Sequence, residues 1–432
     1  MYTPYSACAE SAFRYKILAF LLVYVASISG NLRSVHMLND RLGRIGDYPF
    51  DRLRALLDVC SPSVALAPLS LALGEPQHNS PEIVGQILAE NGSLWGKYPP
   101  VRGTPEFRTA IGKWLTNRYG LSKKMLEPDK SIIPVSGTRE ALFMVALTVI
   151  PELIRGRQPA VLMPNPFYQV YLGAAALAGA EPLFVSATPK TNFLPDFLSV
   201  DKDTLDRTAL AYFCSPSNPQ GTAASIKTLM DNIKLAREHN FVIVFDECYS
   251  EIYNNTPPPG SIEACEKLGG SLDNVLIMNS LSKRSSVPGL RSGFVAGDPE
   301  IISRFKQVRD YGGAPPPLPL LAVATALWQD ESHVEQNRTL YRKKFDLATE
   351  KLSGLHGYYL PDGGFYLWLD VGHSENSALK LWKEGALRVI PGTYLAKTGH
   401  DGINPGDSYI RCALVHDLDT TNQALDRLIN IL

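Results

Sequence analysis

The chain has 432 residues, of which 45% are hydrophobic and 20% are charged, and its formal net charge is −1. This composition is typical of a soluble globular protein of two or three domains, and it gives no electrostatic basis for binding nucleic acid or an anionic membrane. The six cysteines form no CxxC pair, and the eight histidines show no HxxxH or HxH spacing. We therefore expect free thiols, no disulfide framework and no metal site.

The first 36 residues differ from the rest of the chain. An apolar stretch, Ile17–Ile28, follows Arg14 and Lys16, which is the outline of a signal peptide and is too short to span a bilayer. The alternative is that the working protein begins at Met37, where an amphipathic pattern starts. We favour this alternative, in which residues 1–36 are a non-core extension from a misassigned start and the protein is cytoplasmic.

Short apolar runs alternate with amphipathic segments between about residues 130 and 300. Helices are predicted over Leu142–Leu153 and Ile226–His239. Buried strands are predicted over Ser131–Val135, Ala160–Met163, Leu210–Phe213, Phe241–Phe245 and Val275–Met278. The alternation indicates an α/β domain with a mostly parallel sheet, in which ligands bind beyond the carboxyl ends of the strands.

A glycine- and proline-rich segment from Gly312 to Pro319 predicts a domain boundary, because prolines at this density stop regular structure. Beyond it come helical patterns over residues 322–328 and 333–352 and a strand-like run, Gly364–Leu369. We expect the following division: residues 37–75 join a small domain, residues 76–319 form a large domain, and residues 320–432 form the rest of the small domain.

A segment of small residues follows the first predicted strand. Gly137, Thr138 and Arg139 open a helix, where exposed backbone N–H groups and the helix dipole favour an anion. The alternative is a simple capping motif, in which Ser136 or Thr138 is followed by Glu140.

The next two strands end in residues that suit a planar ligand. Tyr168 can stack on a ring, although a lone tyrosine is more often a core or rim aromatic. Asn218 can donate a hydrogen bond to a ring hydroxyl, although Asn-Pro followed by glycine is also an ordinary turn.

The strand over Phe241–Phe245 ends in two carboxylates, Asp246 and Glu247. An acid at the end of a buried strand is costly unless it is paired, and a protonated pyridine nitrogen is a suitable partner for Asp246. Tyr249 follows three residues later and can hydrogen-bond a ring oxygen. The alternative for Asp246 is a helix cap or a salt bridge.

The most informative segment runs from Ser280 through Ser282 and Lys283 to Arg291. A lysine that follows a buried strand can become a neutral nucleophile, because desolvation disfavours its ammonium form. The two hydroxyls and the guanidinium can hold a dianionic phosphate. An amine nucleophile beside a phosphate pocket is what pyridoxal phosphate requires, and the alternative is a surface cluster of basic residues.

Near the carboxyl end, Arg411 lies in an otherwise apolar strand. A buried arginine needs an anionic partner, and the α-carboxylate of an amino-acid substrate would serve. An internal salt bridge is the alternative.

These residues follow one another in an order and spacing that resemble the class I/II aminotransferases, which are fold-type I pyridoxal-phosphate enzymes, over about residues 40–432. The resemblance implies an α/β fold with a mostly parallel seven-stranded sheet and a smaller α/β domain. It implies three catalytic residues, Lys283, Asp246 and Tyr168. The cofactor-binding residues that it implies are Gly137, Thr138, Arg139, Tyr168, Asn218, Asp246, Tyr249, Ser280, Ser282, Lys283, Arg291 and Tyr98.

The same resemblance implies further contacts with substrate and between subunits. Gly74, Asn218 and Arg411 are the implied substrate-binding residues, and Gly74 belongs to a loop that closes over substrate. Tyr98 is expected to reach the phosphate of the partner subunit, so a homodimer is expected.

Several longer strings look like bacterial N-succinyldiaminopimelate aminotransferases, among them residues 280–299 and 404–415. This resemblance implies transfer of an amino group between glutamate and 2-oxoglutarate on one side and N-succinyl-LL-2,6-diaminopimelate on the other, in lysine biosynthesis. Arg284 and Arg102 are candidates for a distal carboxylate of the substrate, with structural salt bridges as the alternative. Three other functions stay open: an alanine, aspartate or aromatic aminotransferase, a β-lyase that uses the same cofactor, and a non-catalytic regulator that binds it.

Overall fold

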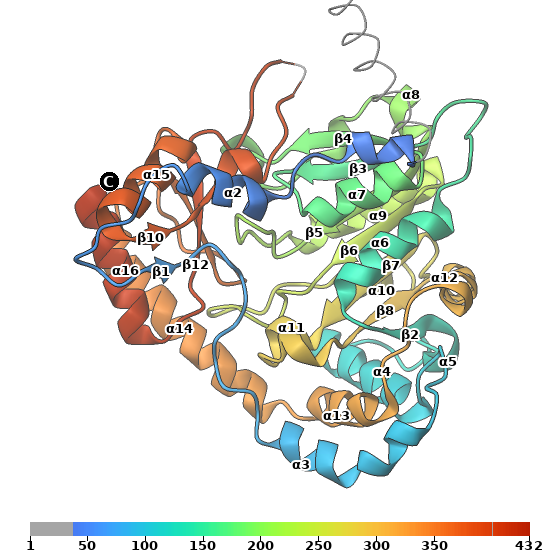
Figure 1. Cartoon of the computed structure of the whole chain (residues 1–432). Coiled ribbons are helices and arrows are strands. Elements are labelled where there is room, and N and C mark those ends of the chain that lie inside the picture. Colours follow the sequence, from blue (N-terminus) through green and yellow to red (C-terminus); the bar gives the residue numbers. More distant parts are fainter. Residues whose placement is uncertain (1–37, 400) are drawn as a thin grey trace, which may run out of the picture. The chain divides into compact units, whose positions relative to one another are not determined.

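The computed structural model describes residues 38–399 and 401–432 (Figure 1). The chain divides into two compact units, residues 1–46 and residues 47–432. The described part of the first unit contains one short 3-10 helix, η1 (Asp40–Arg44). The expected extension over residues 1–36 lies outside the described residues, and all that follows concerns the second unit.

A seven-stranded sheet forms the centre of the second unit. The strand order is β2-β8-β7-β6-β5-β3-β4. β8 runs antiparallel to its neighbours β2 and β7, and the other neighbouring strands are parallel. The expected mostly parallel seven-stranded sheet is therefore confirmed. Its strands are β2 (Ile132–Val135), β3 (Ala160–Asn165), β4 (Glu181–Ser186), β5 (Thr208–Cys214), β6 (Val242–Asp246), β7 (Val275–Ser280) and β8 (Gly293–Gly297).

Both faces of this sheet are covered, because successive residues of each strand enter different apolar clusters. Ile132 packs with one cluster and its neighbour Ile133 packs with the other. Figure 1 shows helices on the two sides of the sheet. The first cluster takes side chains from α4 (Pro105–Tyr119), α9 (Ile226–His239), α10 (Ser261–Lys267) and α13 (Leu318–Gln329). The second takes them from α6 (Thr138–Val149), α7 (Gln169–Leu177) and α12 (Pro299–Tyr311).

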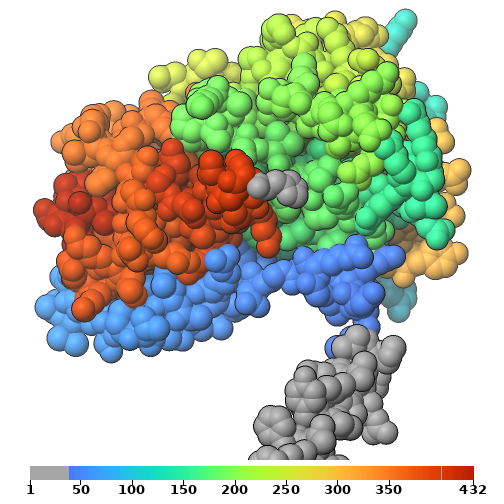
Figure 2. Space-filling model, turned by 90° about the horizontal axis from the view of Figure 1, so that it is seen from above, coloured from blue at the N-terminus to red at the C-terminus, as the bar shows by residue number. Residues whose placement is uncertain are grey.

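Two small sheets lie apart from the large one. β9 (Tyr366–Asp370), β11 (Ile390–Pro391) and β12 (Tyr409–Ala413) form an antiparallel sheet in the order β11-β12-β9. β1 (Leu69–Ser70) pairs in parallel with β10 (Leu387–Arg388). In Figure 2 the first residues of this unit, in blue, run beside the last residues, in orange and red.

Apolar clusters around the small sheets draw on both ends of the chain. Leu53 and Leu57 of the N-terminal part are buried with Trp368 and Trp382. The helices here are α2 (Pro49–Leu57), α14 (Ser332–Leu352), α15 (Ser374–Gly385) and α16 (Leu418–Ile431). The division into residues 37–75, 76–319 and 320–432 stays a prediction.

The remaining elements are short. They are α3 (Ile83–Glu90), α5 (Pro128–Ser131), α8 (Lys202–Leu205), α11 (Leu281–Arg284), η2 (Gly92–Gly96), η3 (Pro189–Thr191), η4 (Phe197–Ser199), η5 (Pro288–Leu290) and η6 (Gly392–Tyr394). No helix within residues 38–399 and 401–432 combines the length and apolarity that a membrane crossing needs.

Candidate active site

A cavity of about 570 Å³ opens where β5, β6 and β7 end. Ligands of parallel α/β sheets bind at this edge, because loops and helix N-termini converge there. The register of the sheet places Cys214 beside Asp246 and Asp246 beside Met278. Predicted site residues that line the cavity are Gly74, Thr138, Arg139, Tyr168, Asn218, Asp246, Tyr249, Ser280, Ser282, Lys283, Arg291 and Arg411.

Lys283 lies on the short helix α11, directly after β7. The Ser280 side chain caps this helix by accepting a hydrogen bond from the Ser282 N–H at 3.3 Å. Lys283 Nζ donates to the carbonyl oxygen of Gly74 at 2.5 Å. Burial lowers the pKa of Lys283 to about 8, and the positive charges of Arg411 and Arg291 act in the same direction. A good fraction of this amine is therefore neutral and nucleophilic near pH 8.

Asp246 is a buried carboxylate at the end of β6, with 6% of its surface exposed. The Tyr171 hydroxyl donates to Asp246 Oδ2 at 2.8 Å, and the Cys248 N–H donates to Oδ1 at 3.4 Å. Burial raises the pKa of Asp246. Among the described residues no lysine, arginine or histidine forms an ion pair with it, so the salt bridge considered as an alternative is absent there. A protonated pyridine nitrogen is the kind of cation that this carboxylate lacks.

Tyr168 and Tyr249, the two tyrosines predicted to contact the cofactor, are among the tyrosines that line this cavity. The Tyr249 and Tyr366 hydroxyls are 3.2 Å apart, and one of them donates to the other. Arg139 Nε donates to the Tyr168 hydroxyl at 2.8 Å. Burial raises the pKa of Tyr168 to about 12, so this hydroxyl is neutral at physiological pH. Both phenols therefore offer neutral hydroxyls and ring faces to a planar ligand.

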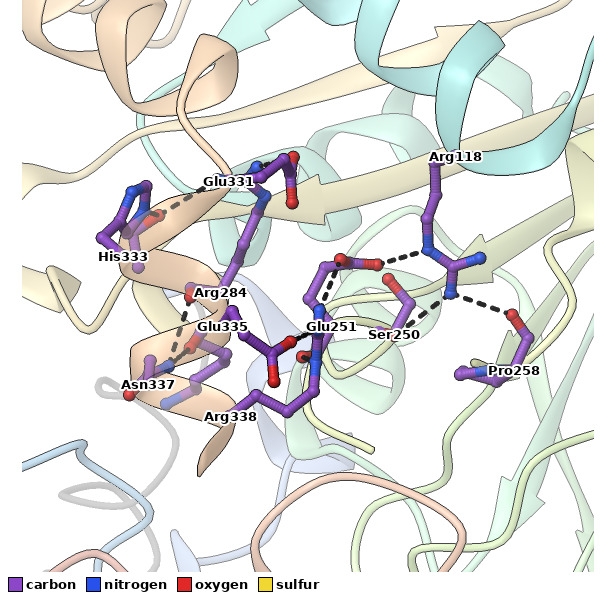
Figure 3. Close-up of polar contacts among 12 residues, drawn as sticks. Arg118, Ser250, Glu251, Pro258, Arg284, Glu331, His333, Glu335, Asn337 and Arg338 are labelled. Carbon is purple, nitrogen blue, oxygen red and sulfur yellow. Dashed lines mark hydrogen bonds and ion pairs between the residues drawn. The ribbon is translucent and has the colours of Figure 1, made fainter. Parts of the chain in front are cut away.

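The turn that carries Tyr249 ends at Glu251, which is the centre of a buried ionic cluster (Figure 3). Glu251 Oε1 accepts from Arg118 Nε at 2.8 Å, and Glu251 Oε2 pairs with Arg338 Nη2 at 3.3 Å. Arg118 also donates to the carbonyl oxygen of Pro258 at 3.1 Å. Because each charge has a partner, the cluster fixes the Asp246–Glu251 turn without leaving an uncompensated buried ion.

The start of α6 forms a cradle for an anion. Gly137 is the N-cap residue, with φ +88°, and no side chain caps the first N–H groups of this helix. Ser136 Oγ donates instead to the carbonyl oxygen of Ala314, at 2.7 Å, so it does not cap the helix. The capping motif is half present, because Glu140 accepts from the Ser136 N–H at 3.1 Å. Uncapped N–H groups at the end of a twelve-residue helix are well suited to a phosphate.

Arg291 lies against this cradle. Its Nη2 donates to the carbonyl oxygen of Ser136 at 3.2 Å, and its Nη1 donates to that of Pro288 at 2.7 Å. The two main-chain contacts hold the guanidinium beside Gly137. A phosphate bound at the helix start would therefore meet a fixed positive charge.

Arg411 of β12 is 5% exposed and faces the cavity. Its Nη1 donates to Asn218 Oδ1 at 3.1 Å and its Nη2 donates to the carbonyl oxygen of Ala72 at 2.8 Å, while its Nε has no hydrogen-bond partner. No carboxylate among the described residues pairs with it, so the internal salt bridge considered as an alternative is not seen. A buried guanidinium without an anion is suited to a substrate carboxylate.

Three predicted residues lie elsewhere. Tyr98 is 97% exposed and does not line the cavity, and its expected contact across a subunit interface stays a prediction. Arg284 is not part of the cavity lining and pairs with Glu331 (Figure 3), and its guanidinium packs over the Trp328 ring. Arg102 donates to the carbonyl oxygen of Asp129 and is also outside the lining. The two arginines therefore hold structure and are not carried further as residues for a distal carboxylate.

Sequence reasoning missed several residues of the cavity. Tyr171 and Tyr366 contact Asp246 and Tyr249, and Cys248 Sγ lies 3.1 Å from Thr138 Oγ1. Tyr171 could have been found from the sequence, because it follows Tyr168 by three residues at the start of a helix, a spacing that places two side chains on one face.

Residues 68–428 match the family model of aminotransferase class I and II. A solved aminotransferase from Neisseria meningitidis Z2491 is 39% identical, with a TM-score of 0.87 over 91% of this chain and 99% of that one. The 4-dedimethylamino-4-oxo-anhydrotetracycline transaminase OxyQ of Streptomyces rimosus is 31% identical over 80% of this chain and 88% of its own. An LL-diaminopimelate aminotransferase of Dehalococcoides mccartyi is 28% identical over 84% of this chain and 90% of its own.

None of these three carries the name of an N-succinyldiaminopimelate enzyme, so the comparisons support the general resemblance and not the narrower one. The buried Asp246 without a cation, the buried Arg411 without an anion and the uncapped start of α6 fit a bound pyridoxal phosphate and an amino-acid substrate. The chain belongs to the class I and II aminotransferases, which use pyridoxal 5′-phosphate as their cofactor.

Proposed function

We propose that this aminotransferase exchanges the amino group of glutamate with N-succinyl-2-amino-6-ketopimelate, giving 2-oxoglutarate and N-succinyl-LL-2,6-diaminopimelate for lysine biosynthesis. The observation that carries the substrate proposal is the charge of the cavity lining. Its cations are Lys283, Arg139, Arg291 and Arg411, and its only carboxylates among the described residues are Glu75 and Asp246.

The cofactor accounts for part of this charge. Lys283 would bond to it, Asp246 would pair with its ring nitrogen and Arg291 would pair with its phosphate. Arg411 remains for the substrate, and we assign Arg139, which the resemblance placed with the cofactor, to the substrate as well, against Glu75 alone. N-succinyl-LL-diaminopimelate has three carboxylates and one ammonium group, and glutamate has two carboxylates, so both suit a lining with this excess of positive charge.

Each residue has a definite task in the proposed reaction. When bound, the cofactor supplies a carbonyl group that takes up the substrate nitrogen and a ring that accepts electrons from the α-carbon. Arg411 binds the α-carboxylate and orients the α C–H bond. The neutral Nζ of Lys283 takes the proton from the substrate α-carbon and would deliver it to the carbon of the cofactor's carbonyl group.

The remaining residues hold this arrangement. Asp246 keeps a proton on the ring nitrogen, and the Tyr171 hydroxyl orients the carboxylate. Tyr168 would pack against the ring and Tyr249 would donate to its oxygen. The phosphate would be held by the N–H groups at Gly137 and Thr138 together with Ser280, Ser282 and Arg291.

A second candidate substrate is free LL-diaminopimelate. The LL-diaminopimelate aminotransferase of Dehalococcoides mccartyi is 28% identical to this chain, and Glu75 in the lining would pair with a distal ammonium group. Free diaminopimelate has two ammonium groups and two carboxylates, so its distal ammonium group would pair with Glu75 and its distal carboxylate with Arg139, but it lacks the third carboxylate of the succinyl derivative.

The deciding experiment is a half-reaction on the purified protein with bound cofactor. Loss of the absorbance of the lysine-bound cofactor is followed after adding N-succinyl-LL-diaminopimelate, LL-diaminopimelate, glutamate, alanine or aspartate. Fast conversion with the succinylated compound and with glutamate is the expected result. Fast conversion with LL-diaminopimelate and slow conversion with its succinyl derivative would select the second candidate, and conversion with alanine or aspartate alone would contradict both.

We also propose that the enzyme is a cytoplasmic homodimer in which Tyr98 contacts the phosphate bound by the partner subunit. Support comes from the nearly complete exposure of this large side chain in a single chain. Sedimentation measures the oligomeric state. Tyr98→Phe is expected to weaken cofactor binding and to leave the oligomeric state unchanged. Unchanged affinity in this variant would remove Tyr98 from the site.

A further inference from the structure

Asn337 of α14 holds the main chain of the catalytic lysine. Its Nδ2 donates to the carbonyl oxygens of Lys283 and Arg284, each at 3.2 Å (Figure 3). These carbonyls belong to the last turn of the four-residue helix α11, which is not followed by a further turn whose N–H groups would donate to them. One buried side chain therefore supplies the hydrogen bonds that fix where the Lys283 backbone lies.

The other end of the Asn337 amide reaches the segment after Gly74. Asn337 Oδ1 lies 2.6 Å from His78 Nδ1, and His78 Nε2 lies 2.7 Å from Lys344 Nζ. Lys344 Nζ also donates to the carbonyl oxygen of Leu414, at 3.2 Å. Lys344 and Asn337 are both buried on the same helix, α14.

The donors at the two ends fix the direction of the hydrogen bonds in this chain. Asn337 must turn its NH₂ group to the two carbonyls and its Oδ1 to His78, so His78 Nδ1 carries the proton and His78 Nε2 accepts from an N–H of Lys344, which both the charged and the neutral amine have. Nδ1–H then donates to Asn337 Oδ1 and holds the amide in this orientation. Burial and the charge of Lys344 lower the pKa of His78 to about 4, and burial lowers the pKa of Lys344 to about 7.

These contacts close a ring around the active-site lysine. Its backbone is bound by Asn337, which is bound by His78. Four residues before His78, the Gly74 carbonyl accepts from Lys283 Nζ at 2.5 Å. The hydrogen-bonded pair His78–Asn337 therefore positions both ends of Lys283. Asn337 holds the lysine backbone, and His78 holds the segment whose Gly74 carbonyl contacts Nζ.

We propose that His78 and Asn337 are positioning residues for Lys283, and that Lys344 stabilises the tautomer through which they act. The inference rests on Lys283 being the lysine that bonds to the cofactor. It extends the active site to three buried or half-buried groups that contact neither cofactor nor substrate. Their effect is expected on the proton transfer made by Lys283 rather than on substrate binding by Arg411.

The test compares His78→Ala, Asn337→Asp and Asn337→Ala in the full-length holoenzyme. Asn337→Asp keeps the volume but cannot donate to two carbonyls. Thr349→Val is the matched control, since it removes a hydrogen bond from the same helix, the 2.7 Å contact to the Tyr358 hydroxyl, far along α14 from these residues. Half-reaction kinetics, amide exchange of residues 74–80 and the pH titration of cofactor absorbance are measured for each.

We expect kcat of the half-reaction to fall about ten- to a hundredfold in the His78 and Asn337 variants, with KM changed by less than about threefold. Exchange of residues 74–80 is expected to be faster, and the pH midpoint of cofactor absorbance to shift. The double variant His78→Ala/Asn337→Ala should be no slower than the worse single variant, because both break one chain. Thr349→Val should change none of these.

His78 is only half-buried, so His78→Ala is expected to fold even if an Asn337 variant does not. Wild-type kcat and absorbance titration in His78→Ala would overturn the positioning role. Borohydride reduction followed by peptide mapping separates this failure from that of the proposed function. If the cofactor is fixed on Lys283 and His78→Ala has wild-type kinetics, the positioning role of His78 and Asn337 is refuted and the proposed function stands. If the cofactor is fixed on another residue, the assignment of Lys283 is refuted.

Discussion

Gly137 and Arg291 lie so close together that a side chain on the glycine would overlap with Nη2 of the arginine. Arg291 is in turn bound to the carbonyl oxygens of Ser136 and Pro288. The contact brings the positive charge of Arg291 to the uncapped N-terminus of α6. Two independent sources of anion affinity therefore meet at one point, which depends on the missing Cβ of residue 137.

Gly137→Ala should weaken cofactor binding. A Cβ would displace the Arg291 guanidinium, and alanine is strained at φ +88°. We expect the Kd of pyridoxal phosphate to rise at least about tenfold, which corresponds to about 1.4 kcal/mol. Equilibrium titration of the apoprotein measures it. Gly173→Ala, where a Cβ meets nothing within 4 Å, is the control and should bind the cofactor normally.

Asp246→Asn should slow the reaction and raise the thermal stability of the apoprotein. An amide cannot keep the ring nitrogen protonated, so kcat should fall about a hundredfold or more, the scale on which loss of one preorganised electrostatic contact slows an enzyme. The thermal midpoint of the apoprotein should rise, because a buried carboxylate without a cation is removed. Tyr171→Phe, which removes only the 2.8 Å hydrogen bond, should cost about tenfold. Equal kcat in wild type and Asp246→Asn would contradict this role.

Arg411→Ala should weaken every amino-acid substrate alike. All of them share the α-carboxylate, and loss of a buried charge partner costs about 2–5 kcal/mol in kcat/KM. Half-reactions with glutamate, alanine and the succinylated compound measure the loss. A deficit confined to one substrate would assign Arg411 to a distal group instead. Arg102→Ala lies outside the cavity and should leave all three unchanged.

The attachment of the cofactor to the apoprotein should depend on pH through Lys283. Its folded pKa of about 8 lies below the usual 10.5, because burial disfavours the ammonium form. The neutral amine attacks the aldehyde, so the rate should rise with pH and level off above about pH 8. Stopped-flow absorbance after mixing with pyridoxal phosphate measures it. A rate that still rises beyond pH 10 would show an ordinary, solvated lysine.

The parts of the fold that could be predicted are those in which local pattern and burial agree. The strands β2, β3, β5, β6 and β7 are apolar runs buried on both faces, and all five were expected from the sequence. α9 has the expected bounds, because Ser225 caps its start and Asn240 ends it in the left-handed region. β4 and β8 were not expected, since β4 is a half-buried edge strand with a proline and β8 begins and ends with glycine.

The active site divides in the same way. Residues such as Asp246 and Lys283 could be predicted, because each lies at or just after the end of an apolar run that predicts a buried strand. The partners that complete them could not, because Tyr171 lies 75 positions from Asp246 in the sequence and only the fold brings them together. Arg284 shows the opposite error: it adjoins Lys283 in sequence, but successive residues of a helix point in different directions, and its side chain is buried against Trp328.

Gly74 and Tyr366 share one small space beside the active site. The backbone at Gly74 passes so close to the Tyr366 hydroxyl that a side chain at position 74 would overlap with the phenol ring. The same phenol contacts the Tyr249 hydroxyl at 3.2 Å and lies 4.4 Å from the Arg411 guanidinium. A larger residue at position 74 would therefore displace the Tyr366 phenol, and with it the contacts of that phenol with Tyr249 and Arg411.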